Sequence, residues 1–215
     1  MAGTLWERLT AAELATQNAL ADDQIRAALA TYGYDEARIQ QGYDLFTAAR
    51  ELAVTQQSDY GDQYGATAEL SQTWETAQKN YMRDLKVARI ALRDNAAAEA
   101  ALKLNGKRKK SFSGWMEQAQ TFYGNMLENP EYVTEMGRFG YTQEGLLTAI
   151  DEIQAVIDAN LAQESSKGIA QDATRQRDAR ADEMDQWMSD FKAISLLALE
   201  DNSQMLEKLG FGAIP

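Results

Sequence analysis

Mostly apolar residues recur at steps of three and four along four stretches of the chain, at 39–53, 70–92, 146–157 and 184–198. This spacing places them on one face of a helix, with polar residues on the other face. Polar stretches at 56–65 and 163–168 interrupt the pattern, and they carry Gly61 and Gly168. We therefore expect two helical hairpins that turn at these glycines. The alternative is one continuous helix through each glycine, which would be roughly 85 Å long and would expose apolar surface.

The second half of the chain repeats the first. Setting Asn18 on Asn125 (125 − 18 = 107) aligns a collinear series of identical residues, and one deletion later the displacement becomes 188 − 82 = 106. The series includes Leu20/Leu127, Gly33-Tyr34/Gly140-Tyr141, Asp44/Asp151, Gln56/Gln163, Gly61/Gly168, and then Met82/Met188, Asp84/Asp190 and Lys86/Lys192. An ordered series of this kind indicates an internal duplication. We divide the chain into a first helical repeat at 1–106, a basic connector at 107–112 and a second helical repeat at 113–215, and expect the two repeats to pack as one domain.

Helix-terminating residues recur at matched positions in the two repeats. They are Asp22 and Asn129-Pro130 where short helices should begin, Gly33 and Gly140 where these should end, and Asp35 and Thr142 as N-caps of the long helices. The chain has only 2 prolines and few β-branched residues. The predicted fold is all-α, with a four-helix bundle-like core made of two tandem-duplicated long helical hairpins and with short helices capping its ends.

Charge and hydropathy narrow the possible partners. The net charge of −12 would repel a phosphate backbone, so nucleic acid binding is not expected. No apolar run has the length needed to cross a bilayer, and the first residues lack the basic-then-apolar order of a signal peptide. We therefore expect a cytoplasmic protein without a membrane partner. The sequence resembles all-α bacterial proteins, and this resemblance implies no family or activity.

The chain contains no His and no Cys. Their absence removes Ser-His-Asp and Cys-His catalysis, zinc fingers and the Glu-x-x-His sites of di-iron bundles. We assign no catalytic, cofactor-binding or metal-binding residue. The acidic cluster of Asp182, Glu183 and Asp185 is interpreted as solvated surface, and a carboxylate-dependent metal site there is the alternative.

Two sets of charged residues are candidate contact sites. Lys107, Arg108, Lys109 and Lys110 form a basic run in an acidic chain; they are a candidate anion or partner contact, or else a solvated connection. Asp84, Lys86, Asp190 and Lys192 are matched between the repeats; they are a candidate inter-repeat polar cluster, or else exposed surface. The aromatic residues Trp74, Tyr81, Trp187 and Phe191 fall at helical spacing, which favours core packing over a ligand pocket.

These observations favour a non-enzymatic helical interaction or scaffold protein that binds a protein partner or associates with itself. The alternative is a small-molecule-binding helical bundle with its pocket at the interface between the repeats. The first function would be supported by a crosslinked partner, and the second by a small molecule that accompanies the protein through purification.

Overall fold

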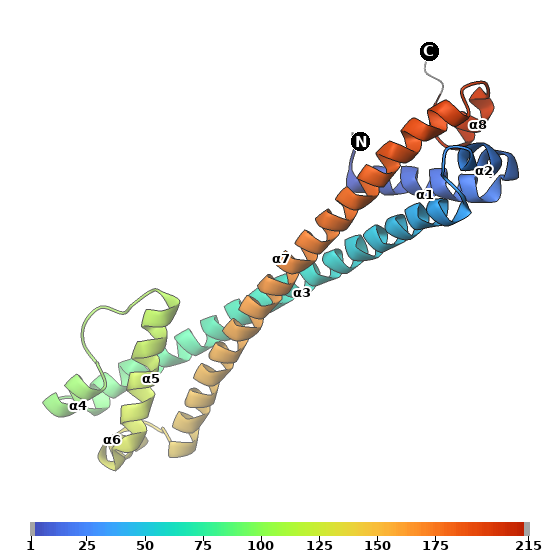
Figure 1. Cartoon of the computed structure of the whole chain (residues 1–215). Coiled ribbons are helices and arrows are strands. Elements are labelled where there is room, and N and C mark those ends of the chain that lie inside the picture. The colour runs from blue at the N-terminus through green and yellow to red at the C-terminus, as the bar shows by residue number, and fades with distance from the viewer. Residues whose placement is uncertain (1–2, 213–215) are drawn as a thin grey trace. The chain divides into compact units, whose positions relative to one another are not determined.

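The structure is a computed structural model that describes residues 3–212. These residues form eight α-helices and no strands. In chain order they are α1 (Leu5–Ala21), α2 (Asp23–Ala30), α3 (Glu36–Ala91), α4 (Ala96–Ala101), α5 (Phe112–Glu128), α6 (Pro130–Gly137), α7 (Gln143–Ala198) and α8 (Ser203–Lys208) (Figure 1). The all-α prediction is confirmed.

The helix boundaries recur at a constant displacement. The first residues of α5, α6, α7 and α8 follow those of α1, α2, α3 and α4 by 107 residues (112 − 5, 130 − 23, 143 − 36 and 203 − 96), and the last residues do the same. The displacement of 106 that aligned Asp84 with Asp190 is therefore not the structural one in the second part of the long helices. At 107 the counterpart of Asp84 is Phe191, and both side chains are buried.

The predicted helix termini are confirmed. Asp35 Oδ1 accepts from the Arg38 backbone N–H at 2.9 Å, and Thr142 Oγ1 accepts from that of Gly145 at 3.0 Å. Gly33 and Gly140 adopt φ angles of +78° and +84° just after the short helices, a region that a side chain disfavours. The side chains of Asp22 and Asn129 cap α2 and α6.

The expected turns at Gly61 and Gly168 are wrong. Both residues lie inside continuous helices, α3 and α7, each 56 residues long. A helical glycine costs only about 1 kcal/mol relative to alanine, and no proline interrupts either segment. This cost is too small to end a helix whose two parts are both held by core contacts. The continuous helix, which was the alternative interpretation, is the one observed.

The chain forms two compact units. Unit 1 comprises residues 1–61 and 168–215, and unit 2 comprises residues 62–167. Each unit combines the first part of one repeat with the second part of the other, so the arms that pack together come from different repeats. The expected pairing of two arms from one hairpin is therefore wrong, and the repeat boundaries at 106 and 113 both fall inside unit 2.

Each unit has its own apolar core. The core of unit 1 joins α1, α2 and α8 to the first part of α3 and the second part of α7. The core of unit 2 joins α4, α5 and α6 to the second part of α3 and the first part of α7. Asn18 donates to the Lys208 carbonyl at 2.5 Å in unit 1, and Asn125 donates to the Ala101 carbonyl at 2.6 Å in unit 2. These matched asparagines thus bind the C-terminal end of the short helix from the other repeat.

Candidate ligand pocket

Asp84 is a carboxylate on the buried face of α3 in unit 2, with 2% of its surface exposed. Its Oδ2 accepts from the Tyr123 hydroxyl at 2.8 Å. Its Oδ1 accepts from the Tyr141 hydroxyl at 2.8 Å and from Arg83 Nε at 3.0 Å. Three donors therefore compensate a charge that would otherwise be costly to bury.

The electrostatics of this cluster follow from burial and from the carboxylate. Burial, with the negative charge of Asp84 as the next cause, raises the pKa of Tyr123 above its usual value. Burial and the hydrogen bond to Asp84 likewise raise the pKa of Tyr141. The hydrogen bond to Asp84 raises the pKa of Arg83. The two tyrosines therefore stay protonated and keep donating their hydroxyl hydrogens across the physiological pH range.

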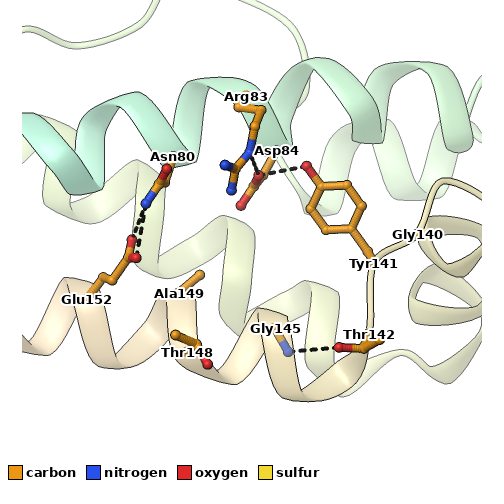
Figure 2. Close-up of a pocket in the computed structure, with 10 residues that line it drawn as sticks. All are labelled: Asn80, Arg83, Asp84, Gly140, Tyr141, Thr142, Gly145, Thr148, Ala149 and Glu152. Atoms are coloured by element: carbon orange, nitrogen blue, oxygen red, sulfur yellow. Dashed lines mark hydrogen bonds and ion pairs between the residues drawn. The ribbon is translucent and has the colours of Figure 1, made fainter.

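A hollow of about 380 Å³ opens beside this cluster. Its lining comes from α3 on one side and from α7 and the loop before it on the other (Figure 2). Asn80 donates its amide to both carboxylate oxygens of Glu152, at 2.8 and 3.0 Å. The remaining lining includes the hydroxyls of Thr142 and Thr148. The pocket contains one guanidinium and two carboxylates, in Arg83, Asp84 and Glu152.

The pocket lies between the two repeats, although all of it belongs to unit 2. Asn80, Arg83 and Asp84 come from residues 1–106, whereas Tyr141 and Glu152 come from residues 113–215. Both repeats therefore contribute side chains to this hollow.

The positions displaced by 107 residues in unit 1 are filled with aromatic rings. Trp187 stands where unit 2 has Asn80, and Phe191 stands where it has Asp84. These two rings stack with centroids 4.8 Å apart and planes at 22°. Both also contact Tyr34, the counterpart of Tyr141. Unit 1 therefore shows how the same fold closes this site with apolar side chains.

Two glycines complete the contrast between the units. In unit 1, a Cβ added to Gly42 would come within 2.3 Å of the Trp187 ring, so only glycine leaves room for the indole. Its counterpart in unit 2 is Ala149. Arg38 lies over the Tyr34 ring at 3.9 Å, whereas its counterpart in unit 2 is Gly145, which has no side chain to take that place over Tyr141.

The structure places the predicted basic run in the loop between α4 and α5 of unit 2. Arg108 donates to the Tyr81 hydroxyl and to the backbone carbonyls of Lys103, Asn105 and Gly106. Lys109 pairs with Glu117, and the hydrogen bonds from Lys103 and Lys109 lower the pKa of Glu117 to about 2. Lys107 and Lys110 are exposed. Arg108 thus stabilises the loop, and the other three cations lie at the surface.

The predicted inter-repeat polar cluster is divided between the units. Asp84 and Lys86 belong to unit 2, and Asp190 and Lys192 belong to unit 1. Asp84 is buried, whereas Lys86, Asp190 and Lys192 are exposed. Of the four, only Asp84 takes part in the pocket.

Sequence reasoning missed Asn80, Arg83, Tyr141 and Glu152 as site residues. The available signal was Asp84 itself, an acidic residue on the apolar stripe that contains Tyr81, Leu85 and Ala88. The prediction that Tyr81 and Phe191 belong to the core is confirmed. Trp74 and Trp187 are half-buried and pack against the same two cores.

Within residues 3–212, no group of three or more acidic side chains is arranged to hold a metal ion. Asp185 instead pairs with Arg8, and Glu183 pairs with Arg180. In the same described range, none of the helices combines the length and the apolar character that a bilayer crossing requires.

The fold and this site define an all-helical protein that has a polar pocket in one unit and an aromatic cluster at the matched place in the other. Compared with known proteins, the chain matches no family model, no curated protein and no solved structure at a significant level. The arguments for its function therefore come from its own geometry.

Proposed function

We propose that this chain is a non-enzymatic helical binding protein in which unit 2 holds a small polar ligand in the pocket beside Asp84. The observation that carries the proposal is the contrast between the units. Unit 1 fills the matched place with Trp187 and Phe191, whereas unit 2 keeps a buried carboxylate next to a hollow. A buried charge is costly, and unit 1 shows that apolar side chains can take its place. The presence of the Asp84 carboxylate in unit 2 therefore supports a functional role for it.

The free hydrogen-bonding groups indicate the chemistry of the ligand. Both carboxylate oxygens of Asp84 already accept hydrogen bonds from neighbouring side chains. Asp84 would therefore orient the pocket, and other residues would contact the ligand. Arg83 gives Asp84 its Nε, and its side chain is 64% exposed, so its terminal amino groups can reach a ligand in the pocket. Glu152 accepts from Asn80 and retains lone pairs for a further donor. The ligand would carry a carboxylate or carbonyl group for Arg83 and an ammonium or hydroxyl group for Glu152, as an amino acid does.

The test compares the native protein with a variant that carries the two aromatic rings of unit 1 and the glycine beside them. Asn80→Trp and Asp84→Phe introduce the two rings, Ala149→Gly makes room for the indole, and Tyr123→Phe removes the hydroxyl that would lose its acceptor. We call this the filled-pocket variant. Native mass spectrometry of each protein, purified from its own host, reports any retained small molecule.

We expect a molecule of defined mass on the native protein and none on the filled-pocket variant. A second measurement uses thermal shift with a panel of amino acids, where only the native protein should respond. The same adduct on both proteins would place the ligand elsewhere. The absence of any adduct, together with no thermal response, would reject the pocket as a ligand site.

Exposed apolar side chains support a second candidate, the helical interaction or scaffold protein. Three pairs of large apolar residues occupy matched positions and are each about half exposed: Tyr32/Phe139, Val54/Leu161 and Ile90/Leu197. Single exposed apolar residues are ordinary, but recurrence at the same three positions of both units is unexpected for unconstrained surface. We infer that both units present the same contact positions to a partner protein or to a second copy of the chain.

A photo-crosslinking amino acid at Val54 or Leu161 tests this second function in the host cell. Matched controls carry the same amino acid at Glu51 or Asp158, which are also 107 residues apart and exposed. The proposal expects one shared crosslinked species from Val54 and Leu161 and a much weaker one from the controls. Equal crosslinking at all four positions would contradict it.

We also propose that this is a bacterial protein and that the chain arose by internal duplication, as the sequence suggested. The uniform displacement of all eight helices supports this origin. So do the matched caps and the equivalent hydrogen bonds of Asn18 and Asn125. On this interpretation, the pocket of unit 2 is one of the places where the two copies have diverged.

A further inference from the structure

A second hollow, of about 620 Å³, lies on unit 2 between α3, the loop before α5 and α5 itself. It shares no lining residue with the pocket beside Asp84. Four cationic side chains line it, Lys79, Arg108, Lys109 and Lys110, against one carboxylate, that of Glu75. The local excess is therefore 4 − 1 = 3 positive charges, in a chain whose net charge is −12. We name this hollow the basic groove.

The cations converge from two separate elements. Lys79 comes from α3, whereas Lys110 comes from the loop that precedes α5. Both are exposed, and neither has an ion-pair partner within residues 3–212. A loop that served only as a solvated connection would not need to bring two unpaired lysines together. The helix α5 begins two residues after Lys110, with Ser111 as its N-cap, and its N-terminus adds to the positive potential.

The loop that presents Lys109 and Lys110 is fixed rather than loosely attached. Arg108 donates to the Tyr81 hydroxyl at 2.9 Å and to the Asn105 carbonyl at 2.6 Å. The Lys109 backbone N–H donates to the side-chain oxygen of Gln118 at 2.9 Å. Because these bonds already hold the backbone, an incoming anion would meet preorganised cations and would lose less free energy to ordering them.

The remaining lining is largely apolar. Trp115 and Tyr81 are almost fully buried, and Met82 is half-buried beside them. The indole nitrogen of Trp115 is buried and has no acceptor. In unit 1, the positions that match Trp115 and Gln78 are Arg8 and Asp185, which form an ion pair. The combination of free cations over an apolar lining is thus particular to unit 2.

We propose that the basic groove binds an amphipathic organic anion, a molecule with a phosphate, sulfonate or carboxylate group attached to an apolar body. The anionic group would lie between Lys79 and Lys110, and the apolar body would lie against Met82 and the edge of Trp115. Such an anion has two sources, a soluble metabolite and the headgroup region of an anionic lipid, and the experiment separates them.

The probe is 8-anilinonaphthalene-1-sulfonate, an aromatic sulfonate whose fluorescence rises in apolar surroundings. It is titrated into the intact protein, into Lys79→Gln/Lys110→Gln and into Lys86→Gln/Lys107→Gln. The second double variant removes the same number of exposed lysines from unit 2 outside the groove. We expect the groove variant to bind about tenfold more weakly, a loss of about 1.4 kcal/mol, because the sulfonate loses its charge-assisted contacts with the two lysines. The control should stay within about twofold of the native protein, because its lysines act only through long-range charge.

Competition then identifies the source of the anion. Displacement of the probe by a soluble alkyl phosphate, but not by phosphatidylglycerol vesicles, supports a soluble ligand. Displacement by the vesicles, weakened in Lys79→Gln/Lys110→Gln, supports a lipid headgroup. Equal weakening of the probe in both double variants, or no binding to the native protein, would overturn the proposal. Neither result bears on the pocket beside Asp84, which the filled-pocket variant tests separately.

Discussion

Asp84 offers the most direct comparison between a buried charge and its apolar alternative within one chain. The perturbation has two arms, Asp84→Ala and the filled-pocket variant. In Asp84→Ala, the Tyr123 hydroxyl is left buried without an acceptor, which costs about 1–3 kcal/mol. Loss of the Arg83 contact adds little, because that side chain is 64% exposed. With the small cavity that remains, we expect Asp84→Ala to lower the free energy of unfolding by about 2–4 kcal/mol.

The filled-pocket variant should behave differently. It removes the carboxylate together with the Tyr123 hydroxyl, and the Tyr141 hydroxyl, which also loses its acceptor, is only partly buried at the edge of the hollow, where water can replace that acceptor. It buries two rings, each contributing about 1.5–3 kcal/mol, against the loss of hydrogen bonds that contribute about 1 kcal/mol each. Replacement of buried charge by well-packed apolar groups is often neutral or stabilising by about 1–4 kcal/mol. We therefore expect stability equal to that of the native protein or up to about 3 kcal/mol greater.

The assay is urea unfolding followed by circular dichroism and by tryptophan fluorescence. The decisive quantity is the difference between the two arms, which should exceed about 2 kcal/mol. If the filled-pocket variant is as unstable as Asp84→Ala, the packing seen in unit 1 is not transferable, and the pocket reflects a structural requirement of unit 2. If Asp84→Ala is neutral, the carboxylate is not held as tightly as its three hydrogen bonds imply.

Three further predictions test the helices and the titrating groups. Gly61→Ala and Gly168→Ala should each stabilise the protein by about 0.5–1 kcal/mol in thermal unfolding, because both glycines are helical with no atom near a new Cβ. The control Gly33→Ala should destabilise the protein, because Gly33 has a φ of +78°. A loss of stability in Gly61→Ala or Gly168→Ala would indicate a turn at that glycine. Because the pKa of Tyr123 is raised in the folded protein, its contribution to stability is complete below pH 10 and is lost as pH rises further, by about 1.4 kcal/mol per pH unit. In Tyr123→Phe, the free energy of unfolding should therefore fall less steeply with pH above pH 10. An unchanged slope would contradict this. Lys103 has a φ of +48°, which favours glycine, and its bond to Glu117 is an exposed surface pair that contributes little. Lys103→Gly should therefore stabilise unit 2 by about 1 kcal/mol in urea unfolding, and a loss of stability would contradict this.

Local features of the fold could be predicted from the sequence because their causes are local. A cap such as Asp35 or Thr142 needs only a side chain and a backbone N–H three residues later. The glycines with positive φ after the short helices can be predicted in the same way, because the residue after each glycine donates a hydrogen bond back into the helix. These features lie within a few residues of each other, so periodicity and spacing suffice to find them.

The course of the long helices could not be predicted in this way. A polar stretch with a glycine is compatible with a turn and with an exposed helical segment, and the two differ by only a few kcal/mol of local free energy. The outcome depends on which arm each part packs against, and here the partner is the arm of the other repeat. A hairpin would have paired arms from the same repeat, which is a non-local alternative that spacing does not distinguish.

The site was partly visible in the sequence. Asp84 stands out as an acidic residue on an apolar stripe, but its partners Tyr123 and Tyr141 are 39 and 57 residues away along the chain. Pairing it with Asp190 at a displacement of 106 gave the wrong counterpart and hid the contrast. At 107, the aligned residue is Phe191, and the substitution of an aromatic core residue by a buried carboxylate becomes apparent.

This contrast separates two explanations for a buried polar cluster. A cluster needed for folding would be expected in both units, because the same helices meet in the same order in each. Unit 1 folds around Trp187, Phe191 and Gly42 without it. The carboxylate, the Tyr123 donor and the open position at Gly145 are therefore dispensable for this architecture, whereas Tyr141 has its counterpart in Tyr34. The joint presence of the first three in unit 2 supports the proposal that the hollow beside them binds a ligand.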